Sequence, residues 1–284
     1  MPSYLLHPPP RQAYNPAHRA EDDMNTPLSQ QDQWLAQLDS FHSRQRQEAL
    51  NALLARPTSP QAPSEPRVNM HLHSFFSFNT HGYSPSHLAW QAHQAALYAA
   101  GLCDFDVLDG LEEFLQAGLL LGLRTSVSLE TRAFLKDFAS LEINSPGEPG
   151  VIYIMGAGFP RLPSDTIRAG TVSLEALGRQ ARERLQSLVQ RINARLPQIA
   201  LDYEKELAIL APGGCPTERH LVQAYRRKTL TKFKTEAEQH AFWAQLLKKT
   251  LPEVARWAAN IPQLEDAIRT ALVKRGGLGY LPPT

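Results

Sequence analysis

The chain has 284 residues, which is enough for one large domain or two smaller ones. Its 29 basic and 28 acidic residues nearly cancel, and this balance argues against a dedicated binder of nucleic acid or of membrane surfaces. The sequence contains no apolar run of about 18 residues that predicts a membrane span, no signal-peptide pattern and no cysteine framework for disulfides. We therefore expect a cytoplasmic protein without a membrane partner.

Two segments precede the first predicted strand. Residues 1–30 are rich in proline, asparagine and glutamine without periodicity, which predicts disorder, and Met24 is an alternative start. Residues 31–66 are predicted to form an amphipathic helix, capped by Ser29 and packed on the main domain, and a proline-rich linker over 57–66. A helix that binds a partner is the rarer alternative.

The apolar run that follows ends in two histidines placed two positions apart. On a β-strand, positions i and i+2 point to the same side, so His71 and His73 can direct both imidazoles at one metal ion. A His-x-His pair alone is more often part of a polar loop. Its interpretation therefore depends on the segments that come next.

Two further β-prone runs, over residues 102–107 and 123–129, each lead into carboxylates. Segments with helical periodicity separate the runs, and this alternation is typical of a parallel α/β fold, in which active sites form at the carboxyl ends of the strands. The last run ends at Glu130, which we place beside the two histidines. Arg132 could neutralise a carboxylate or hold a phosphate through its planar donor fork.

Asp104 and Asp106 share one face of the middle strand. Two buried carboxylates are costly unless a metal, hydrogen bonds or water compensate them. We expect Asp104 in the site. Asp106 stays undecided, because Asp106 or Asp109 could simply cap the helix predicted over residues 111–121.

Three other histidines lie near these motifs. His81, in the loop after the first strand, could reach the site as a general acid, although a loop histidine without function is the commoner case. His87 and His93 fall on a helix predicted over residues 84–100 with Ser84 as its cap, and we expect both to face solvent.

These residues resemble the PHP (polymerase and histidinol phosphatase) family of metal-dependent phosphoesterases over roughly residues 67–160. The sequences that carry the resemblance are His71-x-His73 with Ser77, Gly-Leu-Cys-Asp-Phe-Asp over 101–106 and Ser-Leu-Glu over 128–130. The resemblance implies an α/β fold, a TIM-related (β/α)7 barrel with up to three metals at its C-terminal mouth. Its ligands here would be His71, His73, Asp104 and Glu130.

The chain departs from the family pattern at three points. Phe105 stands where the family usually has a histidine, Ile154 lies where a further histidine is common, and the late Asp-x-His pair is absent. We therefore expect one or two divalent ions, of Mn, Zn or Fe, rather than three.

The rest of the chain has helical periodicity. Helices are predicted over residues 174–196, 217–230, 235–249, 252–259 and 262–273, with His220 exposed at the start of the second. We interpret residues 67–163 as the first part of the barrel, 164–274 as a long helical insertion and 275–284 as the start of the next barrel segment. The barrel is then incomplete in this chain, and an open sheet with an unpaired edge strand is expected.

The leading hypothesis is a metal-dependent phosphoesterase that acts with metal-activated water on an anionic small-molecule substrate. Arg132 and the basic segment over residues 217–284 would stabilise the anion, and His81 is the candidate acid. Two alternatives stay open. An amidohydrolase also opens with His-x-His on its first strand, and a non-catalytic relative is favoured by Phe105 and Ile154. Metal content separates the enzymes from the binder, and phosphate release against amide cleavage separates the two enzymes.

Overall fold

The computed structural model of the chain describes three stretches, residues 29–56, 66–162 and 168–282. It divides into two compact units, residues 1–60 and 61–284, which are described separately. The disorder predicted for residues 1–30 and the linker predicted over 57–66 fall almost entirely outside the described residues.

The first unit holds two helices in place of the single one predicted. These are α1 (Gln30–Gln37) and α2 (Ser43–Leu54), and Ser29 caps α1 as predicted, because its side chain accepts a hydrogen bond from the backbone of Asp32 at 3.2 Å. The two helices contact each other. Leu38, the C-cap residue of α1, is buried, as are Leu50 and Leu53 of α2.

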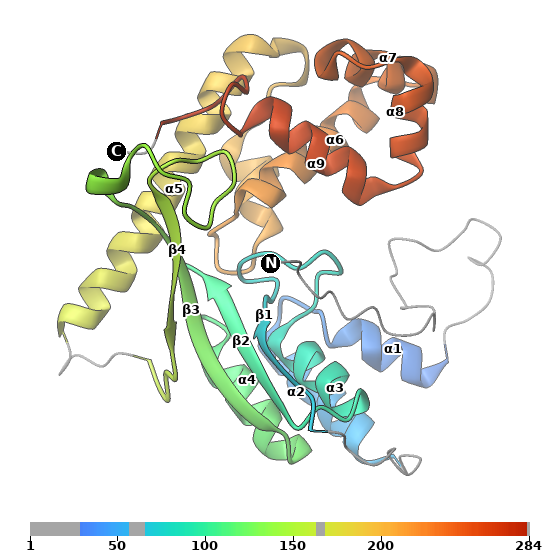
Figure 1. The fold of residues 1–284 in the computed structure, drawn as a ribbon. Coiled ribbons are helices and arrows are strands. Elements are labelled where there is room, and N and C mark those ends of the chain that lie inside the picture. The colour runs from blue at the N-terminus through green and yellow to red at the C-terminus, as the bar shows by residue number, and fades with distance from the viewer. Residues whose placement is uncertain (1–28, 57–65, 163–167, 283–284) are drawn as a thin grey trace. The chain divides into compact units, whose positions relative to one another are not determined.

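The second unit begins with a four-stranded sheet. Its strands are β1 (Val68–Leu72), β2 (Ala99–Phe105), β3 (Arg124–Phe134) and β4 (Val151–Ala157), in the order β1-β2-β3-β4. The first three are parallel, whereas β4 is antiparallel to β3. The sheet is curled (Figure 1), and among the described residues no strand closes it into a barrel. The α/β class and the open sheet are confirmed, and the relation of this sheet to a (β/α)7 barrel stays a prediction.

The third strand is longer than predicted. It was expected to end at Glu130, but it continues to Phe134 because its second half pairs with β4 in antiparallel register. Arg132 lies opposite Tyr153 in that pairing. Glu130 is therefore a residue in the middle of a strand, next to a β-hairpin.

The helix before β2 is shorter than predicted. This helix, α3 (Pro85–Gln94), has Ser84 as its cap, with the Ser84 hydroxyl accepting from the backbone of His87, as expected. It ends well before residue 100 because Ala96 takes a left-handed conformation and β2 begins at Ala99. His87 is buried, not exposed as expected, and its ring stacks on Tyr83 with centroids 3.9 Å apart.

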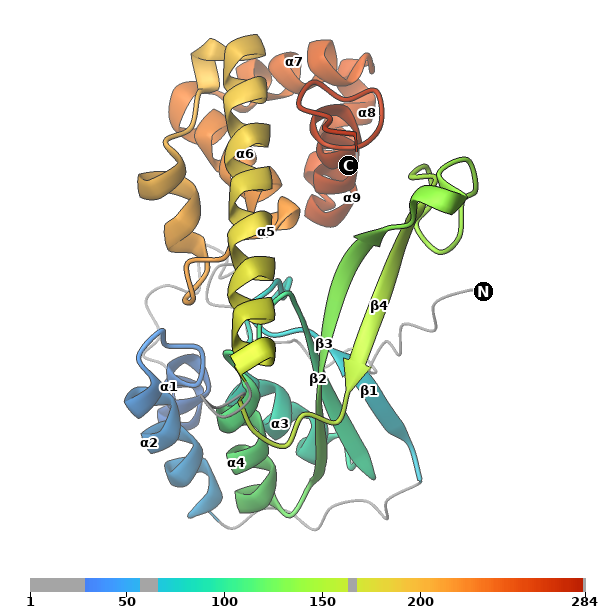
Figure 2. The same cartoon turned by 90° about the vertical axis from the view of Figure 1, so that its left-hand side faces the viewer.

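Gly101, the residue after the helix predicted over 84–100, lies inside β2. A Cβ atom at this position would stand 2.6 Å from the carbonyl oxygen of Met70, so only glycine allows β1 to approach β2 this closely. The next helix, α4 (Leu111–Leu121), has the predicted bounds and ends at Gly122 in the left-handed conformation. Figure 2 shows α3 and α4 on one face of the sheet.

The remaining helices share a second apolar core. They are α5 (Arg168–Arg195), α6 (Glu218–Lys232), α7 (Glu236–Leu247), α8 (Leu251–Ala258) and α9 (Ile261–Leu272), close to the predicted ranges. Short helical turns lie at Lys136–Phe138, Pro197–Ile199, Tyr203–Leu207 and Ala208–Leu210. The core contains Leu188, Ile192, Leu207, Tyr225, Trp243 and Ile268. Helices α6–α9 gather beyond the carboxyl ends of the parallel strands (Figures 1 and 2).

Two predictions for this helical part are wrong. His220 is buried rather than exposed, because its ring nitrogen accepts from the backbone of Thr217 in a capping box. Residues 275–282 do not form the strand of a next barrel segment: Leu278 and Leu281 pack against the helical core, and the Gly279 amide bonds to α9. In the described part of the chain, no helix is both long and apolar enough to cross a bilayer.

Candidate metal centre

Three predicted ligands meet at the carboxyl end of β1. His71, His73 and Glu130 each offer one ligand atom, and these atoms all lie within 4.8 Å of one another. Glu130 Oε2 is 3.2 Å from His71 Nε2 and 3.5 Å from His73 Nε2. The prediction that these three side chains converge is confirmed.

The local backbone explains the convergence. Glu130 is paired with Phe105 across β2 and β3, so both side chains face the same side of the sheet. The register of β1 against β2 shifts between Asn69 and Leu72. Such an irregularity changes the direction in which nearby side chains point and is common next to active sites. The amide of His71 donates to Asn69 Oδ1 at 3.1 Å, which fixes the strand end at this shift.

The two histidines differ in their electrostatics. The hydrogen bond to Glu130 raises the pKa of His71, although partial burial opposes this and the Glu130 charge adds to it. Burial and the neighbouring His71 lower the pKa of His73 to about 4, against the opposing effects of Glu130 and the backbone of Cys103. His73 is thus neutral at pH 7, with a lone pair free for a ligand.

An aromatic row extends from the cluster across the sheet. Phe105 stacks on His73 with ring centroids 4.7 Å apart, and Tyr153 meets Phe105 edge-on at 6.0 Å. Phe105 offers no lone pair, as the sequence indicated. Ile154 is exposed, and its neighbour Tyr153 contacts this row instead.

Asp104 lies elsewhere. It is adjacent to Phe105 on β2, and because successive side chains alternate, it faces away from Glu130. Its buried carboxylate accepts hydrogen bonds from the Ser74 amide at 2.6 Å, the Ser74 hydroxyl at 2.6 Å and the Ser77 hydroxyl at 2.8 Å. Asp104 is not in the cluster of three, so the expected fourth ligand is replaced by an anchor for the loop after β1.

Neither aspartate considered as a cap performs that role, since Gly110 is the N-cap residue of α4. Asp106 adopts a left-handed φ of 59° and accepts from the Thr131 hydroxyl at 2.6 Å. Burial raises the pKa of Asp106, the Thr131 hydrogen bond opposes this, and the Glu130 charge adds to the increase. Asp106 therefore lies within electrostatic reach of the cluster.

The two predicted catalytic residues are not part of the cluster. Arg132 Nη2 contacts Glu148 at 2.9 Å, and its Nε is buried without a hydrogen-bond partner among the described residues. His81 is exposed in the loop, with its ring stacked near Tyr83 at 5.1 Å. The catalytic roles of Arg132 and His81 stay predictions.

Sequence reasoning missed an ionic group beside Arg132. Burial would raise the pKa of Glu148, but hydrogen bonds from Ser145 and Lys274 and the charges of Arg132 and Lys274 lower it to about 2. Glu148 accepts from Lys274 Nζ at 3.0 Å although 126 positions separate them in the sequence. No local pattern signals such a contact; only the Ser145-x-x-Glu148 spacing of the turn is visible.

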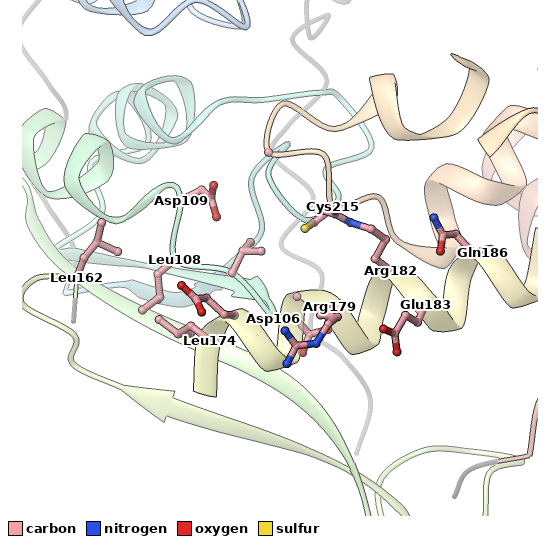
Figure 3. Close-up of a pocket in the computed structure, with 14 residues that line it drawn as sticks. Asp106, Leu108, Asp109, Leu162, Leu174, Arg179, Arg182, Glu183, Gln186 and Cys215 are labelled. Atoms are coloured by element: carbon pink, nitrogen blue, oxygen red, sulfur yellow. The ribbon is translucent and has the colours of Figure 1, made fainter. Parts of the chain in front are cut away.

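A cavity of about 690 Å³ opens next to Asp106. Figure 3 shows Asp106, Leu108 and Asp109 from the segment after β2 across from α5, which contributes Arg179 and Arg182. His71, His73 and Glu130 do not line it. Asp106 links the cavity to the candidate metal centre only electrostatically, because, in addition to burial, the Glu130 charge raises its pKa.

Comparison with known proteins gives a limited likeness. No protein-family model matches the chain, and no curated protein matches it significantly. A crystal structure from Bifidobacterium adolescentis, provisionally named a metal-dependent phosphoesterase, is similar at TM-score 0.48 and 17% identity, covering 78% of this chain and 60% of that one. An amidohydrolase from Chromobacterium violaceum, solved with sulfate and no metal, is similar at TM-score 0.43 and 16% identity, covering 60% and 51%. The chain thus spans less than two thirds of either protein.

Proposed function

We propose that this protein is a metal-dependent hydrolase that acts on a phosphoester. The observation that carries the proposal is the convergence of His71, His73 and Glu130 within 4.8 Å. Two imidazoles and one carboxylate form a mixed donor set that suits Zn, Mn or Fe. Three protein ligands also leave open coordination positions, which is the property of catalytic rather than structural sites.

The residues fit one divalent ion. His73 is already neutral at pH 7, and its Nδ1 is buried with no hydrogen-bond partner in the described part of the chain, although the Cys103 backbone acts on the ring. Glu130 is held within reach of both histidines, and its side chain is only 9% exposed. When bound, the ion would supply Lewis acidity for hydrolysis near neutral pH.

The surroundings favour an anionic substrate. Arg132 follows Glu130 by two positions on the same strand face, so its guanidinium can orient an anion beside the cluster. The cavity near Asp106 gives room for the rest of the molecule. His81 remains the proposed acid, acting from the loop after β1.

Metal binding tests the first part of the proposal. We expect the full chain, stripped with chelator and reloaded with Zn or Mn, to bind one ion, and His73→Ala to weaken this binding about 100-fold, because a third of the donor set is lost. His42→Ala, an exposed histidine of the first unit, is the matched control and should bind as the parent does. Unchanged metal stoichiometry in His73→Ala would refute the site.

Activity tests the second part. Phosphate release from a panel of phosphomonoesters and phosphodiesters, with added Mn, should be lost in His73→Ala and kept in His42→Ala. Metal binding without phosphate release from any phosphoester would remove the phosphoesterase assignment and leave the metal site in place.

A further inference from the structure

His73 lies just beyond the end of its strand. The last residue of β1 that pairs with β2 is Leu72, so the strand pairing does not extend to His73. A histidine that ligates a metal has to keep a fixed ring orientation, because an imidazole binds an ion along the direction of its nitrogen lone pair. For His73 this orientation has to come from contacts outside the β1–β2 pairing.

The side-chain amide of Asn79 contacts the main chain of His73 directly. Asn79 Nδ2 donates to the carbonyl oxygen of His73 at 2.9 Å, across six positions of the loop after β1. On its other side, Asn79 Oδ1 accepts from the backbone amide of His81 at 2.9 Å and from that of Tyr83 at 3.2 Å. Because two backbone donors face the oxygen, the NH₂ group has to face His73, and the partners determine the orientation of the amide.

Asn79 is itself held in place by the loop. The backbone amide of Gly82 donates to the carbonyl oxygen of Asn79 at 3.0 Å, and the amide of Phe75 donates to the carbonyl oxygen of Tyr83 at 2.9 Å. An asparagine side chain that accepts from the backbone two residues further on forms a local turn of its own. The His73 carbonyl is therefore bonded to a side chain that has several other fixed contacts, and not to one that moves freely in solvent.

The ring of His73 has a separate contact. Phe105 stacks on it, with the ring planes 6° apart and the centroids 4.7 Å apart. Stacking fixes the plane of the imidazole, but it leaves the ring free to slide and turn within that plane. The Asn79 bond fixes the backbone from which the ring projects. Together the two contacts keep His73 Nε2 directed at Glu130, whose Oε2 lies 3.5 Å away.

We propose that Asn79 is a positioning residue of the candidate metal centre, whose side-chain amide holds the main chain of His73 so that Nε2 stays directed at Glu130 and at a bound ion. The inference rests on the proposed function for the ion, whereas the placement of the His73 ring can be measured without one. Aspartate would not replace Asn79, because a carboxylate keeps the acceptor for the two backbone amides but has no donor for the His73 carbonyl.

The His73 ring in the metal-free full chain gives the first readout. Protons on a ring stacked over Phe105 resonate upfield, so we expect Asn79→Ala and Asn79→Asp to move the carbon-bound ring protons of His73 downfield. The ¹H–¹³C spectra are recorded at about pH 8, where an ordinary histidine is neutral, and are assigned with His73→Ala. Asn193→Ala is the matched control, because Asn193 bonds to the backbone of Leu201 through Nδ2 at 2.8 Å and Oδ1 at 2.9 Å, and it should leave these protons unchanged.

Binding of Co²⁺ to the same proteins gives the second readout, because the visible absorption of this ion depends on the geometry of its ligands. We expect Asn79→Ala to weaken Co²⁺ binding about tenfold or more, as is typical when a residue that orients a ligand is lost, and to change the absorption bands of the bound ion. Asn193→Ala should bind as the parent does. Asn79→Asp adds a negative charge that attracts the cation, so for this variant the ring protons decide and the affinity does not.

The outcomes separate this role from the proposed function. Moved His73 protons together with weaker Co²⁺ binding in Asn79→Ala, and neither change in Asn193→Ala, support the positioning role. If the parent binds no Co²⁺, the proposed function fails, and the ring protons alone decide whether Asn79 holds His73. Unmoved ring protons in both Asn79 variants overturn the proposal, as does Co²⁺ affinity that stays at the parent value in Asn79→Ala or falls equally in Asn193→Ala. If Asn79→Ala does not fold, Asn79→Asp, which keeps the two acceptor bonds of the turn, decides through the ring protons.

Discussion

Asp104→Ala should destabilise the protein without removing its metal site. The carboxylate of Asp104 is 1% exposed and accepts three hydrogen bonds, two from Ser74 and one from Ser77. Truncation leaves three buried donors without an acceptor, which costs about 1–3 kcal/mol for each donor that water cannot reach. Part of this loss is offset, because alanine also removes a buried charge. We expect a net loss of about 2–4 kcal/mol near pH 5.

The stability lost in Asp104→Ala should become smaller as the pH rises. Burial, opposed by hydrogen bonds from Ser74 and Ser77, raises the pKa of Asp104 to about 6 in the folded protein, above its ordinary value of 3.8. The folded state therefore binds the proton more tightly, and this contribution to stability is fully present below pH 4 and is lost as the pH passes through 6. One pKa unit corresponds to about 1.4 kcal/mol, so the advantage of Asp over Ala should fall by about 2–3 kcal/mol between pH 4 and pH 7.

Urea denaturation followed by far-ultraviolet circular dichroism, at pH 4, 5, 6 and 7, measures these differences. Asp104→Asn is the matched variant, because the amide keeps one acceptor and does not titrate, so its stability should follow the pH less steeply than the parent. Its affinity for Zn should stay within about threefold of the parent, since no first-sphere donor is lost. A gap between parent and Asp104→Ala that widens with pH would contradict the assigned pKa direction. Zn affinity lost in Asp104→Asn would return Asp104 to the ligand set.

Two further predictions concern the sheet and the ionic group. Gly101→Ala should lower the free energy of unfolding in urea by about 2 kcal/mol or more, because its Cβ would lie 2.6 Å from the Met70 carbonyl oxygen. Gly178→Ala on α5 is the control: its Cβ meets nothing closer than 3.9 Å, so it should be neutral or stabilising. Equal effects of the two substitutions would refute the reasoning. Glu148→Gln should cost about 2 kcal/mol at pH 7, because Arg132 and Lys274 lose their shared carboxylate. Since the pKa of Glu148 is lowered to about 2, that cost should disappear as the pH falls from 4.5 toward 2, and a cost constant over this range would contradict the ion pairs.

Local signals were sufficient for several elements. The bounds of α4 follow from an apolar pattern closed by Gly122, and the start of α3 follows from Ser84 and Pro85, because capping and left-handed turns depend on neighbours in the sequence. The convergence of His71 and His73 on Glu130 also followed from strand ends and parallel order. The helix caps require no knowledge of strand pairing, and the convergence required only the parallel order of the strands, not their register.

The position of Asp104 depends on information that the sequence does not contain locally. Asp104 and Phe105 are adjacent on a strand, so only one of them can face Glu130, and the pairing of Phe105 with Glu130 decides which. A pattern of alternating carboxylates in this run is compatible with either face. His87 and His220 were misplaced because helical periodicity does not mark their contacts. The His87 ring stacks on Tyr83, and the His220 ring accepts from Thr217 and meets Phe78 edge-on.

The antiparallel turn from β3 to β4 has the largest consequence for the site. With a parallel neighbour alone, β3 was expected to end at Glu130. The observed strand continues through Arg132 to Phe134, and the chain then passes Glu148 and comes back as β4, which contains Tyr153. The hairpin thereby brings Glu148 to Lys274, and Tyr153 within reach of Arg269. These contacts join residues more than a hundred positions apart, and they bring two cations of the basic segment over residues 217–284 close to the β3–β4 pair. Two cations of the helical part are thus held by ion pairs: Lys274 pairs with Glu148, between β3 and β4, and Arg269 pairs with Glu218 of α6.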